Sequence, residues 1–413
     1  MTAGIGRRLT GPANGRQGAA GTIAWAAGQA GVALPVRVRA WDGSESGPQG
    51  APTVVLRSPR ALRRVLWRPG ELGLARAYVS GDLDVEGDLT DGLRRVHATA
   101  PRSGPFGLIK TGPAAVAAAA RLGLLAPPPA PPRCELRVRG RRHSRARDQA
   151  VIAGHYDVPS AFYQLILDPS MAYSCAYWDG QKDLSGAQRA KLDLIMGKLA
   201  LEPGQALLDM GCGWGSLTLH AARARVKVTG VTLSREQGGF VRQRARGLGL
   251  APEVRIQDYR DPLDGCYDAI ASVEMGEHVG ATRYPAFCAA LYRRLRPGGR
   301  LLIQQMSRTA RRGGGPFIES YIAPDMDMRP VGDTIRWIQD AGFEVLGVEA
   351  MREHYVRTIR AWLENLEANL PAITQILSAE QVRVWRLYLA GGALAFEQDR
   401  MGVDQILAQR PER

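Results

Sequence analysis

Three glycines, Gly211, Gly213 and Gly215, follow an apolar run in the segment ALLDMGCGWGSLTLHAA and precede a helical pattern. Glycines at such a junction let the backbone approach a ligand closely, at the edge where parallel strands end and helices begin. The GxGxG spacing favours S-adenosylmethionine over a dinucleotide, because no pyrophosphate has to be cradled. Asp209 lies just before the glycines and could hold this loop or the ammonium group of the methionine. The alternative is a tight turn between a strand and a helix that binds nothing.

Neutral side chains are expected to bind the ribose of such a cofactor. Many nucleotide-binding folds place an acidic residue at the end of the second strand for this purpose, but the segment VKVTGVTLSREQ has none there. It offers Thr232, Ser234 and Gln237 instead. The turn IQDYRD further offers Asp258 for the adenine amino group and Tyr259 for packing against the ring, with an ordinary surface turn as the alternative.

The elements that would position these residues alternate between short apolar strands and helices. Strands are predicted for residues 206–210, 226–232, 253–257, 269–273 and 300–305. Short strands separated by helices imply right-handed crossovers and a parallel sheet. The predicted fold class is therefore α/β, a doubly wound Rossmann-like domain preceded by a small α/β amino-terminal domain.

A stretch rich in proline and arginine divides the chain, with APPPAPP followed by RCELRVRGRRHSRARDQ. We predict an amino-terminal domain over residues 1–122, a stiff and solvated linker over 123–150, and the Rossmann-like domain over 151–413. The amino-terminal part reads as a strand, a helix from Pro59 to Trp67 and a second helix near Leu72 to Ser80, without a catalytic constellation. A lipid-binding or membrane-docking role is expected for it. The linker is either a plain spacer or a polybasic stripe for lipid head groups, worth about 1 kcal/mol per charge.

The chain is strongly basic, with a net charge of +14 and a pI near 10.0. This charge predicts a polyanionic partner, either nucleic acid or an anionic lipid surface, although a GC-rich genome also gives such a composition. No RNA-binding aromatic motif or zinc finger accompanies the arginines, so no nucleic-acid partner is expected. The sequence lacks an apolar run of membrane-spanning length and a signal-peptide pattern, and a cytoplasmic location is expected. Five cysteines without CxxC spacing indicate neither a disulfide framework nor a zinc site.

Several segments together resemble the cyclopropane fatty acid synthase family, including its mycolic acid cyclopropane synthase relatives. The matching strings are HYDVPSAFYQLILDPSMAYSCAYW, AQRAKLDLI, LLDMGCGWG, GVTLSREQ, QDYRD, MGEHVG and HYVRTIRAW. The segment LARAYVSGDLDVEGDL also resembles the amino-terminal domain of the branch that acts on bacterial phospholipids. The resemblance implies a C-methyltransferase that uses S-adenosylmethionine and acts on an unsaturated phospholipid in the membrane.

The resemblance also implies roles for individual residues. Cofactor contacts are implied for Tyr173, Ser174, Gly211, Gly213, Thr232, Gln237, Asp258 and Tyr259. A small polar site is implied for Cys175, Glu277, Tyr355 and a histidine at the end of the fifth strand. In the family this site holds a bicarbonate ion, which accepts the proton lost during ring closure.

Two residues depart from the family pattern at this polar site. Gln304 in LLIQQMS stands where the histidine is expected, and Glu274 in SVEMGEH stands where many relatives carry a small residue. We expect the Glu274 carboxylate to take the place and role of bicarbonate, because a free anion beside it would suffer like-charge repulsion. An ion pair between Glu274 and an arginine such as Arg283 is the alternative, and bicarbonate then remains an alternative cofactor. No metal is expected, since no second ligand helix accompanies the Glu277 motif.

The chemistry expected is methyl transfer to an isolated double bond, a poor nucleophile that has to be aligned in a dry pocket. Aromatic faces can stabilise the resulting cation; Tyr177, Trp178, Tyr321 and Trp362 are candidates, and each could equally be core. A base fixed at Glu274 favours a methylene- or methyl-branched fatty acid, with a cyclopropane as the alternative product. A small-molecule C-methyltransferase and a nucleic-acid methyltransferase are rival functions for the same fold. We expect peripheral association with the inner face of the membrane, and a homodimer is left open.

Overall fold

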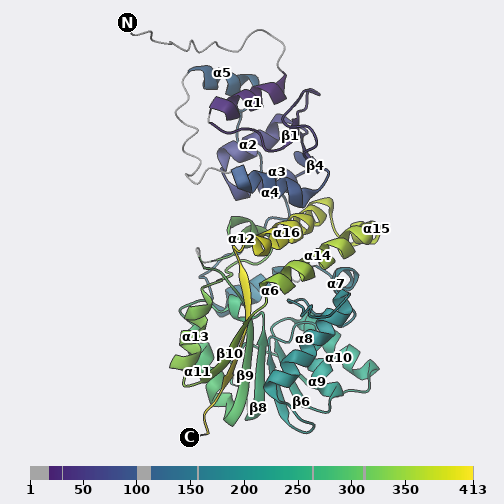
Figure 1. Cartoon of the computed structure of the whole chain (residues 1–413), viewed down its shortest axis with the longest axis vertical. Coiled ribbons are helices and arrows are strands. Elements are labelled where there is room, and N and C mark those ends of the chain that lie inside the picture. Colours follow the sequence, from purple (N-terminus) through teal and green to yellow (C-terminus); the bar gives the residue numbers. More distant parts are fainter. Residues whose placement is uncertain are drawn as a thin grey trace. The chain divides into compact units, whose positions relative to one another are not determined.

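The computed structural model describes residues 18–29, 31–99, 113–155, 158–262, 265–309 and 313–412. The chain divides into two compact units, Met1–Pro132 and Arg133–Arg413 (Figure 1). Within the described ranges, no helix is both long enough and apolar enough to cross a bilayer.

The first unit is a four-stranded sheet, in the order β2-β1-β3-β4, with helices packed on it. Its strands are β1 (Arg37–Arg39), β2 (Glu45–Ser46), β3 (Thr53–Leu56) and β4 (Leu83–Glu86), and its helices are α1 (Ala19–Gln29), α2 (Pro59–Trp67), α3 (Glu71–Val79), α4 (Leu89–Thr99) and α5 (Pro113–Arg121). Helix α2 has the bounds predicted from the sequence. Its start is set by the Ser58 side chain, which accepts a hydrogen bond from the Arg60 backbone, and by Pro59 in the first turn.

The predicted linker is bound to protein along much of its length. Arg64 donates to the Ala130 carbonyl at 2.7 Å, and Trp67 donates to the Ala126 carbonyl at 3.2 Å, so the proline-rich half lies against α2. In the arginine-rich half, Arg145 pairs with Asp261 at 2.5 Å and Arg147 pairs with Asp325. The stretch over residues 123–150 is thus anchored at several points, because some of its arginines find carboxylate partners. Arg133, Arg137, Arg139 and Arg141 are exposed, as expected for a solvated stretch.

The second unit contains a seven-stranded sheet in the order β10-β11-β9-β8-β5-β6-β7. The strands are β5 (Ala206–Met210), β6 (Lys227–Thr232), β7 (Glu253–Ile256), β8 (Tyr267–Val273), β9 (Leu295–Ser307), β10 (Glu344–Ala350) and β11 (Gly402–Gln409). Strands β5 to β9 run parallel, and β11 is antiparallel to both of its neighbours. The predicted α/β class with a doubly wound, Rossmann-like sheet is confirmed. The five parallel strands were anticipated from the sequence, whereas β10 and β11 were not.

Helices cover both faces of this sheet (Figure 1). The helices of the unit are α6 (Arg145–His155), α7 (Ser160–Ile166), α8 (Leu184–Leu199), α9 (Ser216–Arg223), α10 (Arg235–Gly247), α11 (Tyr284–Arg294), α12 (Pro316–Tyr321), α13 (Val331–Asp340), α14 (Arg352–Ala368), α15 (Leu370–Ile376) and α16 (Ala379–Glu397), with a 3-10 turn η2 at Gly276–His278. Successive residues of β5 serve opposite faces: Leu207 packs with α8 and α9, and Leu208 packs with α11. This alternation is what a strand buried on both sides requires.

An aromatic layer joins the later helices to the segment that precedes the sheet. Phe162 of α7, Trp362 of α14 and Trp385 and Phe396 of α16 belong to one buried cluster. The Phe162 and Trp385 ring centroids lie 4.7 Å apart. Because the same cluster includes Cys175 and Tyr355, this layer fixes the positions of two residues predicted to form the site.

Candidate active site

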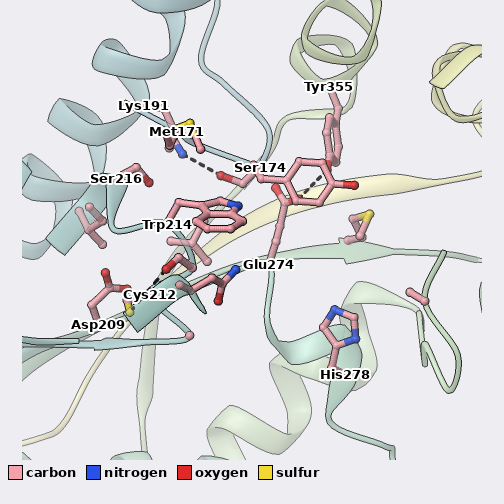
Figure 2. Close-up of a pocket in the computed structure, with 18 of the residues that line it drawn as sticks. Met171, Ser174, Lys191, Asp209, Cys212, Trp214, Ser216, Glu274, His278 and Tyr355 are labelled. Atoms are coloured by element: carbon pink, nitrogen blue, oxygen red, sulfur yellow. Dashed lines mark hydrogen bonds between the residues drawn. The ribbon is translucent and has the colours of Figure 1, made fainter. Parts of the chain in front are cut away.

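A cavity of about 120 Å³ opens where β5, β8 and β9 end. Figure 2 shows its lining drawn from the strand ends, from the stretch that contains Met171 and Ser174, and from α8 and α14. Of the residues singled out from the sequence, it is lined by Tyr173, Ser174, Asp209, Gly211, Gly213, Gln237, Glu274 and Tyr355. The carboxyl ends of parallel strands are the usual place for a ligand in an open α/β sheet.

The glycine loop after β5 is shaped by positive backbone angles. Gly211 has φ 89°, and a Cβ atom there would lie 2.8 Å from the Met275 side chain, so a larger residue is excluded. Gly213 has φ 52°, and a Cβ atom there would meet no atom within 4 Å. Both Gly211 and Cys212 donate backbone hydrogen bonds to the Val231 carbonyl, which ties the loop to β6. The open space over Gly213 is therefore room for a ligand to approach the backbone.

Asp209 lies on β5 and lines the cavity. Its Oδ2 accepts a hydrogen bond of 2.7 Å from the Thr218 hydroxyl of α9. Burial raises the pKa of this carboxyl to about 6, and the Thr218 hydrogen bond and the charge of Lys191 oppose that rise. This bond joins the end of β5 to α9, the two elements that flank the glycine loop, and the predicted role of Asp209 in holding the loop stays a prediction. Contact with a methionine ammonium group stays a prediction.

Gln237, in the first turn of α10, is positioned by Thr232 at the end of β6. The Thr232 hydroxyl donates to Gln237 Oε1 at 2.8 Å, and the Ser234 side chain caps α10 by accepting from the Gln237 backbone. With its oxygen occupied, the Gln237 amide keeps its Nε2 for another acceptor. Gln237 lines the cavity, whereas Thr232 does not line it and only orients the Gln237 side chain.

Asp258 and Tyr259 lie just after β7 and outside the cavity lining. The Asp258 carboxylate accepts from the Arg260 backbone at 2.9 Å and from its guanidinium at 2.6 Å. The Tyr259 ring packs edge-on against Phe287, with 5.4 Å between ring centroids. The structure therefore does not bring this turn together with the other cofactor residues, and its role in adenine binding stays a prediction.

Lys191 of α8 is a buried cation at the cavity that the sequence analysis missed. Its Nζ donates to the Ser174 hydroxyl at 2.8 Å (Figure 2), and the side chain is 1% exposed. Burial lowers the pKa of this ammonium, while the carboxylates of Glu274, Asp168 and Asp209 act against that change. A signal was present, because Lys191 lies at helical spacing on the same face as the apolar Leu184, Ala187 and Ile195.

Glu274 stands at the centre of the predicted polar site. Its Oε1 accepts from the Cys175 backbone at 2.7 Å and from Gln304 Nε2 at 2.8 Å, and its Oε2 accepts from the Tyr355 hydroxyl at 2.6 Å. The residue has φ 50°, a backbone conformation that is rare outside glycine and marks strained functional positions. Its carboxylate is thus held by three donors, and no ion pair with Arg283 is formed.

Two of these donors are themselves held in place. Gln304 is fully buried, and its Oε1 accepts from Gln405 Nε2 at 2.9 Å, while Lys198 donates to Gln405 Oε1 at 2.7 Å. This series of hydrogen bonds fixes which end of the Gln304 amide faces Glu274. The Cys175 thiol points to the Ala176 and Met351 carbonyls, and burial raises its pKa well above the usual value, so its part at the site is played by the backbone N–H.

Glu277 is buried behind this cluster and does not line the cavity. Its Oε1 accepts from the Met306 backbone, and within the described part of the chain its Oε2 has no hydrogen-bond partner. Burial, together with the charge of Glu274, raises the pKa of Glu277 to about 8. Near neutral pH, Glu277 is therefore largely protonated, which relieves repulsion between the two acids.

The aromatic residues at the cavity differ from the four candidates named from the sequence. Tyr177 stacks on His354, Trp178 lies under Arg357, Tyr321 donates to Glu135, and Trp362 packs in the aromatic core. The cavity is lined instead by Tyr173, Trp214, Tyr355 and Tyr388. Helix α14 explains part of this difference. Tyr355 and Trp362 lie seven positions apart on the same face of the helix, and of these two residues Tyr355 is the one that lines the cavity.

These features are those of an S-adenosylmethionine-dependent methyltransferase: five parallel strands, a glycine loop at their carboxyl ends, and a cavity beside that loop. The family model of the mycolic acid cyclopropane synthetases matches residues 143–406. The chain belongs to this family, which uses S-adenosylmethionine. Its relatives are fatty acid methyltransferases and cyclopropane synthases that act on lipids.

Two relatives and one solved structure are similar over long stretches. A probable fatty acid methyltransferase of Mycobacterium tuberculosis is 37% identical over 389 residues, covering 91% of each chain. The cyclopropane-fatty-acyl-phospholipid synthase of Escherichia coli is 36% identical over 281 residues, covering 67% of this chain and 72% of that protein. The crystal structure of a mycolic acid cyclopropane synthase complexed with SAH and CTAB has a TM-score of 0.60 and 32% identity, covering 63% of this chain and 98% of the other.

Proposed function

We propose that this enzyme transfers the methyl group of S-adenosylmethionine to the cis double bond of an unsaturated phospholipid acyl chain, giving a methylene-branched fatty acid, or a methyl-branched one once a separate hydride donor reduces the methylene. The observation that carries the proposal is the Glu274 carboxylate, which is built into the site and held by three hydrogen bonds. The two relatives, a probable fatty acid methyltransferase and a cyclopropane-fatty-acyl-phospholipid synthase, support the substrate class.

The cavity residues fit the cofactor. Bound S-adenosylmethionine supplies an electrophilic methyl group on a sulfonium centre. The open backbone at Gly213, the free amide nitrogen of Gln237, and the Ser174 hydroxyl are the groups that would hold it. Asp209 and Lys191 also line the cavity: Asp209 accepts from Thr218 of α9, and Lys191 donates to Ser174.

The aromatic lining provides for the charge that develops on the acyl chain. Methyl transfer leaves a carbocation, which an aromatic face stabilises without trapping it as a nucleophile would. Tyr173, Trp214, Tyr355 and Tyr388 line the cavity and supply such faces. The Cys175 thiol, which would trap a cation, is turned toward backbone carbonyls and kept protonated by burial.

Glu274 then removes the proton that completes the reaction. A carboxylate that accepts three hydrogen bonds stays at one position, so it selects which C–H bond is broken. Loss of a proton from the added methyl with ring closure gives a cyclopropane, whereas loss from that carbon after a hydride shift gives an exocyclic methylene. We propose the methylene, because the Glu274 carboxylate is held by Cys175 and Tyr355 and tethered to the end of β8, whereas an exchangeable anion between the same two residues would be free to shift. The cyclopropane is the second candidate, favoured by the family itself.

The first unit is proposed to bring the enzyme to the membrane surface. Leu66 and Trp67 at the end of α2 are 55% and 54% exposed, and the same helix carries Arg60 and Arg63. Exposed apolar and aromatic groups among arginines suit the interface of an anionic bilayer. Residues 1–122 would thus act as the docking domain of a cytoplasmic enzyme on the inner face of the membrane.

The test is a substrate competition with purified protein. The protein receives S-adenosylmethionine together with oleoyl phospholipid vesicles, RNA and DNA, and mass spectrometry measures methyl incorporation into each. Gain of one carbon on the acyl chains, without methylation of nucleic acid, is expected. Methylation of nucleic acid with unchanged acyl chains would overturn the proposed substrate.

A further inference from the structure

A second cavity lies beside the active site, between helices α8, α9 and α10. It measures about 190 Å³ and is bounded by the loop Asp168–Ser170. The α8 residues Ser185, Arg189 and Leu192 lie at helical spacing on one face, as do Ser216, His220 and Arg223 of α9. Leu192 and Ser216 line both cavities, so one layer of side chains separates this space from the active site.

Three arginines from three helices converge on the second cavity: Arg189, Arg223 and Arg244. Within the described residues, neither Arg189 nor Arg223 forms an ion pair or a hydrogen bond. Arg244 donates only to the Pro169 carbonyl. Burial and the charge of Arg223 lower the pKa of Arg244, and the charge of Asp168 opposes this change.

The acid that lines this cavity is already engaged. Asp168 accepts from the Ser170 backbone at 2.9 Å, from the Ser170 hydroxyl at 2.9 Å and from the Ala172 backbone at 3.2 Å. These bonds shape the loop, and the single negative charge of Asp168 can offset at most one of the three arginines. His220 is likewise engaged, 2.9 Å from Asp193. The space therefore has an excess of positive charge together with the hydroxyls of Ser185 and Ser216 at its wall.

We infer that this second cavity binds a phosphodiester, and that its ligand is the head-group phosphate of the phospholipid whose acyl chain enters the active site. Phosphate oxygens accept hydrogen bonds from guanidinium groups and hydroxyls. Arginine suits phosphate better than lysine does, because its planar guanidinium can donate two parallel hydrogen bonds. Leu192 and Ser216 border both cavities, so the two cavities are neighbours. We therefore assign the phosphate in the second cavity and the acyl chain in the active site to the same phospholipid molecule. The assignment of a lipid rests on the proposed function, whereas the assignment of a phosphate does not.

The test replaces the three arginines and compares the variant with one of equal charge. The variant R189Q/R223Q/R244Q is matched by R235Q/R246Q/R293Q, which removes three exposed arginines of the same unit that form no ion pairs within the described residues. Inorganic phosphate binding is measured by calorimetry on full-length protein. The KM for vesicles is measured with dioleoyl phosphatidylglycerol and, separately, with the zwitterionic phosphatidylcholine.

The site variant is expected to lose phosphate binding and to show a KM roughly 100-fold higher for both lipids, from about tenfold or less per arginine. The control should keep phosphate binding and its KM for phosphatidylcholine. Phosphate should also inhibit the wild type competitively with vesicles.

Three results would overturn the inference. If only the KM for phosphatidylglycerol rises, the arginines sense surface charge and not a phosphodiester. If phosphate binds at these arginines without competing with vesicles, the site takes free phosphate. If the two triple variants behave alike, the cavity binds no phosphate. Absence of lipid methylation by the wild type would instead refute the proposed function, and calorimetry would still report on the phosphate site.

Discussion

Replacing Glu274 with glutamine separates the base from the scaffold around it. In the folded protein, Cys175 N–H and Gln304 Nε2 both donate to Oε1, which a glutamine retains. Its amide nitrogen would then face Tyr355, whose hydroxyl can turn to accept. The three contacts survive the change, and only the ability to take a proton is lost.

The size of the effect follows from that difference. A positioned general base contributes about 10²–10⁴-fold to a rate, which corresponds to roughly 3–5 kcal/mol in the barrier. The Glu274→Gln variant should therefore lose about that factor in kcat, with the KM for S-adenosylmethionine nearly unchanged. Stability should be equal or higher, because burial raises the pKa of Glu274 and its charged form is the costly one.

The assay follows methyl incorporation into oleoyl phospholipid vesicles under saturating cofactor, with thermal unfolding measured in parallel. Tyr355→Phe is the matched control, since it removes one hydrogen bond to Glu274 and keeps the carboxylate. It should lose only about tenfold in kcat. Full activity in Glu274→Gln, or an equal loss in both variants, would refute the role of Glu274 as the base.

Three further changes test neighbouring features. In Glu274→Gly, whose φ of 50° glycine adopts freely, activity should be low and should recover on addition of bicarbonate; recovery without bicarbonate would contradict the stand-in role. Glu277 keeps its proton to about pH 8 when folded but loses it near 4.5 when unfolded, so stability should fall by a few kcal/mol as pH rises between these values. Denaturant titrations should show a flatter profile for Glu277→Gln, and an unchanged profile would exclude Glu277 as the source. Gly213→Ala should weaken S-adenosylmethionine binding by calorimetry and cost about 1 kcal/mol of stability, because an alanine at φ 52° is strained; unaltered affinity would place the cofactor elsewhere.

The parallel part of the fold could be read from the sequence because its signals are local. Apolar strands such as 206–210 and 269–273 are short and continuous, and each is followed by a helical pattern. Strand β10 carries an exposed leucine, Leu346, and in β11 the adjacent Asp404 and Gln405 interrupt the apolar residues, so neither has the continuous apolar run of the inner strands. The fate of the linker arginines was also hidden, since Arg147 and Asp325 are 178 residues apart in sequence.

Site residues could be predicted where a sequence motif identifies them, and could not where only tertiary packing brings them to the cavity. Glu274, Gln304 and Tyr355 could be grouped because the family pattern names their positions. Lys191 was overlooked because a lysine in a helix is usually solvated, and only the tertiary fold turns it toward Ser174. The same reason explains Tyr388, which reaches the cavity from a helix near the end of the chain and lies within hydrogen-bonding distance of Tyr173, at 3.4 Å.

In the proposed reaction, a fixed carboxylate directs methyl transfer on an acyl double bond toward a methylene product. The most direct measurement is product analysis of oleoyl phospholipid vesicles after incubation with the protein and S-adenosylmethionine. The acyl chains should gain one carbon, and ozonolysis should convert the modified chains to a mid-chain ketone. Modified chains that are heavier by one CH2 group and resist ozonolysis would be cyclopropanes and would contradict the proposed product; chains without added carbon would contradict acyl methylation itself.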